Sequence, residues 1–254
     1  MRRLIIRPGG IGDLIVSLPA LEFLRTEYLE VWVAGPNVPL VRFAGRVRPI
    51  ASTGIDLLGV TDPPERLLRE LMGFDEIVSW YGANRPEFRE LTASLSLPFT
   101  FHRALPIADC IVEAGLHATD FYLRQVRAPL GGIPVIPCES TRENFAVIHP
   151  FSGSARKNWP LEKFRAVARG LEQRMPVHWC AGEEDPPLGG AVRIADLYEL
   201  ACWLGKAQLY IGNDSGITHL AAAVGTPVLA LFGPTDPAVW APRGPHVRVC
   251  RWRA

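Results

Sequence analysis

The most chemically suggestive residues of the sequence lie at positions 211–234, which read IGNDSGITHLAAAVGTPVLALFGP. An apolar strand there runs into a turn of small polar residues, and a short alanine-rich helix and a second apolar strand follow. Such a turn directs free backbone N–H groups and the positive end of a helix dipole at one point, which suits a phosphate. Asp214, Ser215 and His219 add side chains that can bind sugar hydroxyls or a diphosphate. The segment therefore predicts a nucleotide or nucleotide-sugar site.

A purely structural interpretation of this segment stays open beside the functional one. Asp214 can act only as the N-cap of the helix, and His219 can be a packed helical side chain without a ligand. Gly216 and Thr218, which surround Ser215 with further small residues, favour the phosphate-binding interpretation.

A glycine-rich turn after the first apolar strand carries a carboxylate. It contains Gly9, Gly10 and Gly12, and Asp13 follows at the start of a helix. The spacing is not the GxGxxG of dinucleotide-binding turns, so the glycines alone are a weak signal. In one interpretation they make a tight turn and Asp13 caps the helix. In the other, Asp13 lies at a cleft and acts as a general base, which requires hydrogen-bond reach of the proton that it removes.

A third polar loop follows the strand expected at 145–149. Ser152 and Gly153 can surround a phosphate with backbone N–H groups, and Lys157 can supply a mobile positive charge. The alternative is a surface loop with a solvated Arg-Lys pair. The scarcity of lysine, with Lys163 and Lys206 as the only others, favours a specific use of Lys157.

An acidic turn, Gly-Glu-Glu-Asp, occupies positions 182–185. It follows the strand expected at 177–181, and an acidic residue in such a position can bind ribose hydroxyls. Glu183 is the candidate, and an exposed acidic turn without a ligand is the alternative.

Apolar periodicity indicates alternating strands and helices in both halves of the chain. Strands are expected at 3–7, 31–34, 77–80, 99–102, 145–149, 177–181, 209–212 and 228–232. Helices are expected at 13–25, 64–72, 87–95, 108–126, 161–173, 195–204 and 217–224. Residues 38–44 form a weaker helical patch, and 55–58 read as a strand or turn. This alternation predicts parallel sheets with helices on both faces. A Pro/Gly-rich stretch at 128–137 is the candidate linker, so we expect an N-terminal Rossmann-like domain at 1–130, which the family resemblance given below makes the acceptor side, and a C-terminal one at 140–254, which the same resemblance makes the nucleotide-sugar-binding domain.

Composition limits the partners and the location. The chain has 254 residues, 48% apolar and 21% charged, with a net charge of +1. A nucleic-acid binder would usually carry a strong basic excess, so none is expected as a partner. The five cysteines are scattered and form no CxxC pair, which predicts free thiols rather than a disulfide framework or a zinc site. No signal peptide or uninterrupted membrane span is apparent, which predicts a cytoplasmic protein that can contact the inner membrane peripherally.

Three segments occur in an order typical of one enzyme family: RPGGIGD at 7–13, HP…KNWP at 149–160 and NDSGITHLAAAVGTP at 213–227, with LFGPTDP following at 231–237. Together they resemble glycosyltransferase family 9, the ADP-heptose:lipopolysaccharide heptosyltransferases. The resemblance covers both ends of the chain, whereas residues 35–140 match little beyond the general layout. It implies a GT-B fold, that is, two facing Rossmann-like domains with a cleft between them, and inversion at the anomeric carbon.

The resemblance also implies roles for the candidate residues. Asp13 would deprotonate the acceptor hydroxyl, and Lys157 would stabilise the departing diphosphate. Glycines 9, 10 and 12 would form the acceptor-side loop. The implied donor-binding residues are Ser152, Gly153, Glu183, Asp214, Ser215, Gly216 and His219, with Glu183 on the ribose and Asp214 on the transferred sugar. No metal and no cofactor are implied, in agreement with the absence of an Asp-x-Asp motif from the sequence.

The expected function is transfer of a sugar, heptose by resemblance, from a nucleotide-diphosphate donor to a saccharide or glycolipid acceptor such as the lipopolysaccharide core. The sequence of 254 residues is shorter than is usual for the family, and no counterpart of the family's closing helix is expected after the last matched motif. This favours, as the alternative, a non-catalytic nucleotide-sugar-binding or regulatory homologue. An epimerase on the same scaffold is a third hypothesis, because fold alone does not decide activity.

Overall fold

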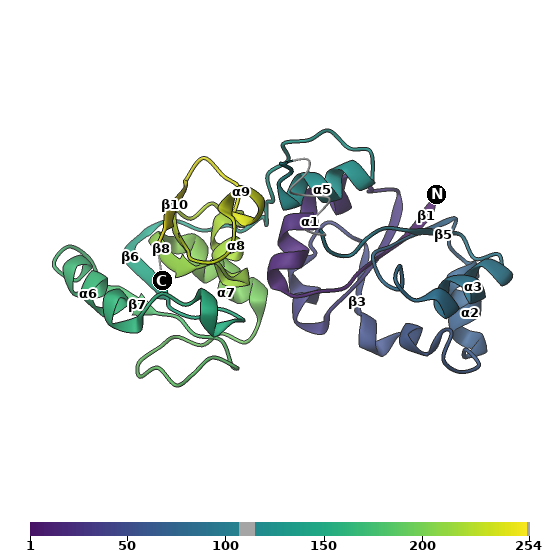
Figure 1. Cartoon of the computed structure of the whole chain (residues 1–254), viewed down its shortest axis with the longest axis horizontal. Coiled ribbons are helices and arrows are strands. Elements are labelled where there is room, and N and C mark those ends of the chain that lie inside the picture. The colour runs from purple at the N-terminus through teal and green to yellow at the C-terminus, as the bar shows by residue number, and fades with distance from the viewer. Residues whose placement is uncertain (107–114, 253–254) are drawn as a thin grey trace.

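Two parallel five-stranded sheets form the framework of the protein, one in each half of the chain (Figure 1). The computed structural model describes residues 1–106 and 115–252. The N-terminal sheet has the order β3-β2-β1-β4-β5, and the C-terminal sheet has the order β10-β9-β8-β6-β7. The first contains β1 Arg2–Arg7, β2 Tyr28–Val33, β3 Arg46–Pro49, β4 Glu76–Ser79 and β5 Phe99–Phe101. The second contains β6 Glu143–His149, β7 Val177–Trp179, β8 Ala207–Asn213, β9 Val228–Phe232 and β10 Val247–Arg251.

Helices cover both faces of the sheets. The N-terminal half has α1 Ile11–Phe23, α2 Glu65–Met72, α3 Pro86–Ser94 and α5 Ala118–Gln125. The C-terminal half has α6 Leu161–Leu171, α7 Leu197–Lys206, α8 Gly216–Ala223 and α9 Pro237–Trp240. The structure also contains four short 3-10 helices: η1 Gly35–Leu40, η2 Ile50–Ser52, η3 Ile55–Leu57 and η4 Ala155–Lys157, counted over the described residues. These elements confirm the α/β class that the alternating pattern predicts.

The strand orders explain why the polar turns come together. In the N-terminal sheet β1 pairs with both β2 and β4, and in the C-terminal sheet β6 pairs with both β7 and β8. At these central strands the strand order changes direction, because successive strands are added on one side of the central strand and then on the other. Open parallel sheets bind ligands at such points, beyond the carboxyl ends of the strands. The glycine-rich turn follows β1, and the two polar loops of the C-terminal half follow β6 and β8.

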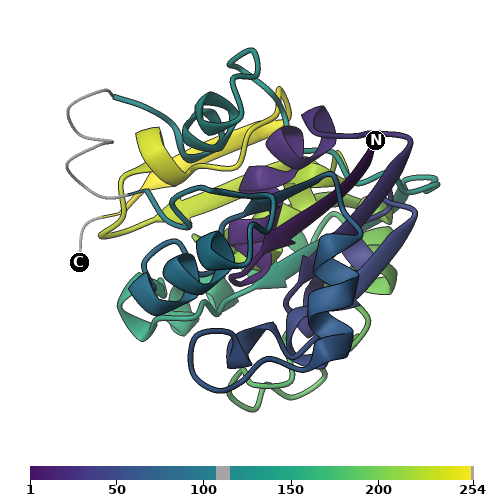
Figure 2. The same cartoon turned by 90° about the vertical axis from the view of Figure 1, so that its right-hand side faces the viewer.

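Successive side chains of β1 point to opposite faces of the N-terminal sheet and belong to two separate hydrophobic clusters. Ile5 packs with α1 on one face, while Leu4 and Ile6 belong to a second cluster with Leu67 of α2 and Phe88 of α3. Figure 2, which faces the N-terminal half, shows the blue helices α2 and α3 in front of purple β1. All three β1 side chains have no exposed surface, as expected for a central parallel strand.

Helix α1 also joins the two halves, because its outer face packs on α8 (Figure 1). One hydrophobic cluster includes Val16 and Leu18 of α1 together with Leu220 and Ala221 of α8. The core on this side therefore runs on from one sheet to the other. The division into domains at 130–140 stays a prediction, although the stretch 128–137 contains no helix or strand, as expected.

A glycine pair permits this close helix contact. A Cβ added to Gly216 would lie 2.9 Å from Ile11 Cβ and 3.0 Å from the Gly12 backbone nitrogen. We expect Gly216→Ala to lower the free energy of unfolding by about 1–3 kcal/mol, because the methyl group must force α1 and α8 apart. Gly170→Ala is the matched control, because Gly170 lies on α6 with open space around its Cβ position. That substitution should raise stability by roughly 0.5–1 kcal/mol. Chemical denaturation measures both changes, and equal stabilisation by the two variants would contradict the close contact.

Two strands and part of one helix differ from the sequence expectations. The pattern missed β3 and β10, which are sheet-edge strands rich in arginine, and charge on an edge strand hides the apolar signal. Of the helix expected at 108–126, the described residues contain α5, which begins at Ala118. Gly115 has a φ of +56°, and His117 Nδ1 accepts a hydrogen bond from Thr119 N as the N-cap. Residues 108–114 of that expected helix lie outside the described residues.

Candidate functional site

A cleft of about 400 Å³ collects the three polar turns. It is lined by Gly12, Asp13 and Val16 of α1, by Gly153, Ser154 and Lys157 after β6, by Asp214, Ser215, Gly216 and His219 after β8, and by Trp240 of α9. Eight of the predicted site residues therefore line one cavity: Gly12, Asp13, Gly153, Lys157, Asp214, Ser215, Gly216 and His219. The cavity lies between the two halves of the chain, since α1 belongs to the N-terminal sheet and the other segments to the C-terminal sheet.

The segment after β8 presents a helix N-terminus to the cleft. Ser215 is the N-cap of α8, and its Oγ accepts a hydrogen bond from Thr218 N at 3.3 Å. Gly216 is the first residue of the helix, so its N–H group belongs to the unpaired set that such an end exposes. Thr218 Oγ1 in turn donates to Asn213 O and ties the turn to the end of β8. This part of the cleft is suited to an anion.

Lys157 and Asp214 form an ion pair across the same region. Lys157 Nζ lies 2.8 Å from Asp214 Oδ2, and Thr235 Oγ1 donates to the same oxygen at 2.7 Å. The Asp214 side chain is 7% exposed, whereas that of Lys157 is 33% exposed. The buried carboxylate thus holds the ammonium group at the cleft wall, where it remains accessible to a bound molecule.

Asp13 combines the structural and the functional interpretations of its turn. Its Oδ2 accepts a hydrogen bond from Gly10 N at 3.0 Å, which caps α1. Its Oδ1 makes no hydrogen bond with the described residues, and the side chain lines the cleft. Gly9 has a φ of +111°, and Asn37 Nδ2 donates to the carbonyl oxygens of Gly9 and Gly10 at 3.1 and 3.3 Å. The turn is therefore held rigidly while one carboxylate oxygen stays available.

His219 is a neutral group in this cleft. Burial lowers the pKa of its imidazole to about 4; the carboxylates of Asp214 and Asp13 act in the opposite direction, and His117 and Lys157 reinforce the lowering. Because the ordinary histidine pKa lies near 6.5, the ring carries no charge near neutral pH. It can offer a single N–H or a lone pair to a ligand, but no positive charge.

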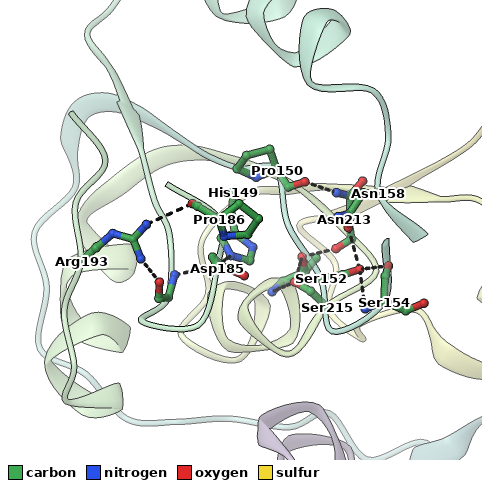
Figure 3. A network of polar contacts seen from close by, with 12 residues as sticks. His149, Pro150, Ser152, Ser154, Asn158, Asp185, Pro186, Arg193, Asn213 and Ser215 are labelled. Carbon is green, nitrogen blue, oxygen red and sulfur yellow. Dashed lines mark hydrogen bonds and ion pairs between the residues drawn. The ribbon is translucent and has the colours of Figure 1, made fainter. Parts of the chain in front are cut away.

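Two predicted donor residues do not line this cleft. Ser152 Oγ lies 2.8 Å from both Ser154 O and Asn158 Oδ1, so it shapes the loop after β6 (Figure 3). Glu183 lines a neighbouring hollow of about 530 Å³, together with Asp185 and Arg193. Their assignment to a donor stays a prediction.

A network behind the loops fixes that neighbouring hollow (Figure 3). His149 Nε2 lies 3.0 Å from Asp185 Oδ2, which also accepts a hydrogen bond from Gly182 N at 2.6 Å. The contact with His149 is the main reason why the pKa of Asp185 lies below its ordinary value. Arg193 donates to the carbonyl oxygens of Gly182 and Pro186. The acidic turn is therefore anchored to the end of β6.

Comparison with known protein families gives a match in the C-terminal half of the chain. Residues 130–253 match the sequence profile described as "Glycosyltransferase family 9 (heptosyltransferase)". This half of the chain belongs to glycosyltransferase family 9. Lipopolysaccharide heptosyltransferase 3 of Escherichia coli K12 is 34% identical over 154 residues, which cover 54% of this chain and 43% of that relative. Lipooligosaccharide heptosyltransferase 2 of Haemophilus influenzae is 29% identical over 112 residues, which cover 37% and 32% of the two chains. The matches thus span less than half the length of these family 9 relatives.

Solved structures extend the likeness to both sheets. A family 9 glycosyltransferase from Veillonella parvula superposes with a TM-score of 0.75 at 17% identity and covers 99% of this chain and 86% of its own. E. coli heptosyltransferase WaaC, solved with ADP, gives a TM-score of 0.70 at 18% identity, with 99% and 93% covered. These similarities confirm the predicted GT-B fold. Among the described residues, no helix is long and apolar enough to cross a membrane, and no group of three or more His, Cys, Asp or Glu side chains could hold a metal.

The structure places a buried cation beside the glycine-rich turn that carries Asp13. Arg7, at the end of β1, is 1% exposed and has no carboxylate partner among the described side chains. It donates to Ser17 Oγ at 2.9 Å, to Asp13 O at 2.7 Å, to Tyr122 OH at 3.0 Å and to Pro8 O. Burial lowers the pKa of the guanidinium, and Tyr122 and Asp13 oppose that effect. Arg7 therefore connects β1, the first turn of α1 and α5.

We expect Arg7→Met to lower the free energy of unfolding by about 3 kcal/mol, because it leaves several buried acceptors without a donor. Arg7→Lys keeps the charge but cannot reach four acceptors, so it should recover only part of the loss. Arg169→Met on the exposed face of α6 is the control and should be near neutral. Urea denaturation measures all three variants, and a loss below about 1 kcal/mol for Arg7→Met would argue against this role.

Proposed function

We propose that this protein is an inverting glycosyltransferase that transfers heptose from ADP-heptose to a saccharide of the lipopolysaccharide core. One observation carries the proposal: a carboxylate from the N-terminal half and an ammonium group from the C-terminal half line the same 400 Å³ cleft, beside the N-terminus of α8. Transfer with inversion needs a base on the acceptor side and positive potential at the leaving group. Asp13 and Lys157 are suited to these two tasks.

The proposed reaction is a single displacement at the anomeric carbon. Asp13 Oδ1 accepts the proton of the acceptor hydroxyl, and the hydroxyl oxygen forms a bond to the anomeric carbon. The bond between that carbon and the diphosphate oxygen breaks, and the electron pair leaves with the diphosphate. Lys157 and the N–H groups at the start of α8 stabilise the negative charge that develops there. ADP and the glycosylated acceptor are the products.

The remaining predicted residues hold the donor in this proposal. Asp214 binds hydroxyls of the transferred sugar, and neutral His219 contributes a hydrogen bond beside the phosphates. Gly153 allows the loop after β6 to approach the diphosphate, and Ser152 keeps that loop in shape. Glu183 binds the ribose from the neighbouring hollow, while Gly9, Gly10 and Gly12 form the acceptor side.

Proteins similar to this chain support the choice of substrates. WaaC was solved with ADP, and TibC, with a TM-score of 0.64 and 15% identity to this chain, was solved in complex with ADP-D-beta-D-heptose. Relatives that match part of the chain, among them that of Escherichia coli K12, are lipopolysaccharide heptosyltransferases. An acceptor of this kind lies at a membrane surface, so we also propose peripheral contact with the inner face of the membrane.

The test is incubation of the protein with ADP-heptose and a heptose-deficient lipopolysaccharide. ADP release and the mass of the acceptor are measured, and the anomeric configuration of the product is determined by NMR. Equal amounts of ADP and heptosylated acceptor with inverted configuration are expected. Calorimetric titration with ADP accompanies the assay. Tight binding without transfer would overturn the enzymatic proposal in favour of a non-catalytic homologue, and a free-sugar or epimerised product would overturn it in favour of hydrolysis or epimerisation.

A further inference from the structure

One large apolar side chain faces the polar cleft from the C-terminal half. Trp240 is the last residue of α9 and lines the cleft together with charged, hydroxylated and glycine residues. Val16 is the other apolar side chain in that lining. Trp240 thus gives an otherwise polar cavity one flat apolar surface.

The Trp240 ring packs partly against the hydrophobic cluster that includes Val16 and Leu220, but it has no specific aromatic or hydrogen-bonding partner among the described residues. Within the described residues it forms no aromatic pair, and its indole Nε1 makes no hydrogen bond. Trp32 and Trp80 differ, because their Nε1 groups donate to Glu30 and Gln125 at 2.7 and 2.6 Å. Trp159 packs edge-on against Phe164. A half-buried tryptophan with a free N–H group at a cleft is a side chain with capacity for a ligand.

The backbone on both sides of Trp240 is held firmly. Asp236 caps α9 by accepting a hydrogen bond from Ala238 N at 3.1 Å, and Trp240 N donates to Asp236 O at 3.0 Å. Directly after Trp240, the Ala241 carbonyl oxygen lies 2.8 Å from His117 Nε2. His117 Nδ1 accepts a hydrogen bond from Thr119 N, so Nε2 carries the proton and donates to Ala241.

An ion pair reinforces this attachment two residues further on. Both Arg243 Nη atoms contact the Asp120 carboxylate of α5, one at 2.8 Å, and Nη1 also donates to Gly132 O at 3.2 Å. Bidentate pairs of this kind fix geometry more strongly than single contacts. The segment 241–243 is therefore fastened to the N-terminal half, and the backbone that carries Trp240 is held in place before any ligand binds.

We infer that Trp240 packs against the C–H face of the donor's sugar ring and determines how tightly the sugar part of the donor binds. The inference rests on the proposed function. A sugar ring presents hydroxyls at its rim and C–H groups on its face, so it needs both polar partners and one flat apolar partner. The donor sugar is the part that must lie between Asp13 and Lys157. Trp240 follows β9 of the sheet that also supplies Lys157 and Asp214, which places the ring on the donor side.

The test compares the binding of ADP and ADP-heptose by calorimetric titration. The variants are Trp240→Ala, Trp240→Phe and, as a matched control, Trp203→Ala, whose ring stacks on Phe145 of the C-terminal sheet instead of lining the cleft. We expect Trp240→Ala to weaken ADP-heptose binding about tenfold and to leave ADP binding within about twofold. Trp240→Phe should keep most of the affinity for ADP-heptose. Circular dichroism verifies that each variant is folded, and Trp240→Phe supplies the comparison if Trp240→Ala is not.

Several outcomes separate this inference from the proposed function. Wild-type protein that binds neither ligand overturns both. If the wild-type protein binds ADP-heptose more tightly than ADP, and the ratio of the two Kd values is the same in Trp240→Ala, only the role of Trp240 is overturned. An equal loss for ADP and ADP-heptose, or an effect confined to the KM of the acceptor, also overturns it.

Discussion

Replacement of Asp13 by Asn is expected to lower kcat by about 10²–10⁴-fold, the usual contribution of a general base. The amide cannot accept the proton of the acceptor hydroxyl. Its oxygen can still accept the hydrogen bond from Gly10 N, so the cap of α1 and the fold should persist. Binding of ADP should change little, because the phosphate-binding groups lie in the C-terminal half. The rate of transfer from ADP-heptose and the Kd of ADP are the two measurements.

Asp196→Asn is the matched control for this variant. Asp196 caps α7 through hydrogen bonds from Tyr198 N and Glu199 N, and it does not line the cleft. The same chemical change there should leave kcat nearly unaltered. If Asp13→Asn retained wild-type turnover, Asp13 would be only the helix cap that the structural interpretation describes.

Replacement of Lys157 by Met is expected to lower kcat by about 10²–10³-fold, in the range observed when one charge-stabilising donor is removed. The diphosphate then leaves without the ammonium group that offsets its developing charge. Asp214 keeps its hydrogen bond from Thr235 but loses the cation, and this unpaired carboxylate also repels the diphosphate. We therefore expect the Kd of ADP to rise as well, which separates this variant from Asp13→Asn.

Two further variants refine the interpretation of Lys157. Lys163→Met removes an exposed lysine of α6 whose ammonium group lies over the Trp159 ring. This substitution should leave the rate of transfer unchanged. Lys157→Met combined with Asp214→Asn removes both charges, so it should recover part of the ADP affinity while transfer stays slow. Recovery of wild-type turnover in the double variant would show that the ion pair is structural only.

The sequence allowed prediction of the elements and turns whose signal is local. The glycines around Asp13, the small residues after β8 and the buried runs of β1, β6 and β9 each show their role within about ten neighbouring residues. The loops after β6 and β8 were expected to meet, because parallel strands place their carboxyl ends at the same edge of a sheet. Their meeting with the turn after β1 of the other sheet was expected from the two facing domains of the GT-B layout. The match of residues 130–253 to glycosyltransferase family 9 agrees with the family resemblance of the loops after β6 and β8, whereas that of the turn with Asp13 stays a prediction.

Other features depend on contacts between distant segments and left no local pattern. Arg7 looks like an ordinary charged strand residue until Tyr122 and the turn of α1 enclose it. Thr235 contributes to the site only because its hydroxyl contacts Asp214 in the folded protein. Trp240 reaches the cleft in a segment that is attached to the N-cap of α5. Two signals in the sequence could have raised Arg7 and Trp240 as candidates. One is an arginine at the end of an apolar run, and the other is a tryptophan three residues after an Asp-Pro pair.

The contact between α1 and α8 has a consequence for how the protein moves. Gly12 and Gly216 bring the two helices together directly beside Asp13 and Ser215. If one lobe rotates relative to the other, this packed contact is expected to act as the pivot. The distance between the carboxylate and the phosphate-binding helix end then varies least, and the rim of the cavity travels furthest. Substrates can enter and products can leave at the rim while the geometry around the bond-forming atoms is preserved from one turnover to the next.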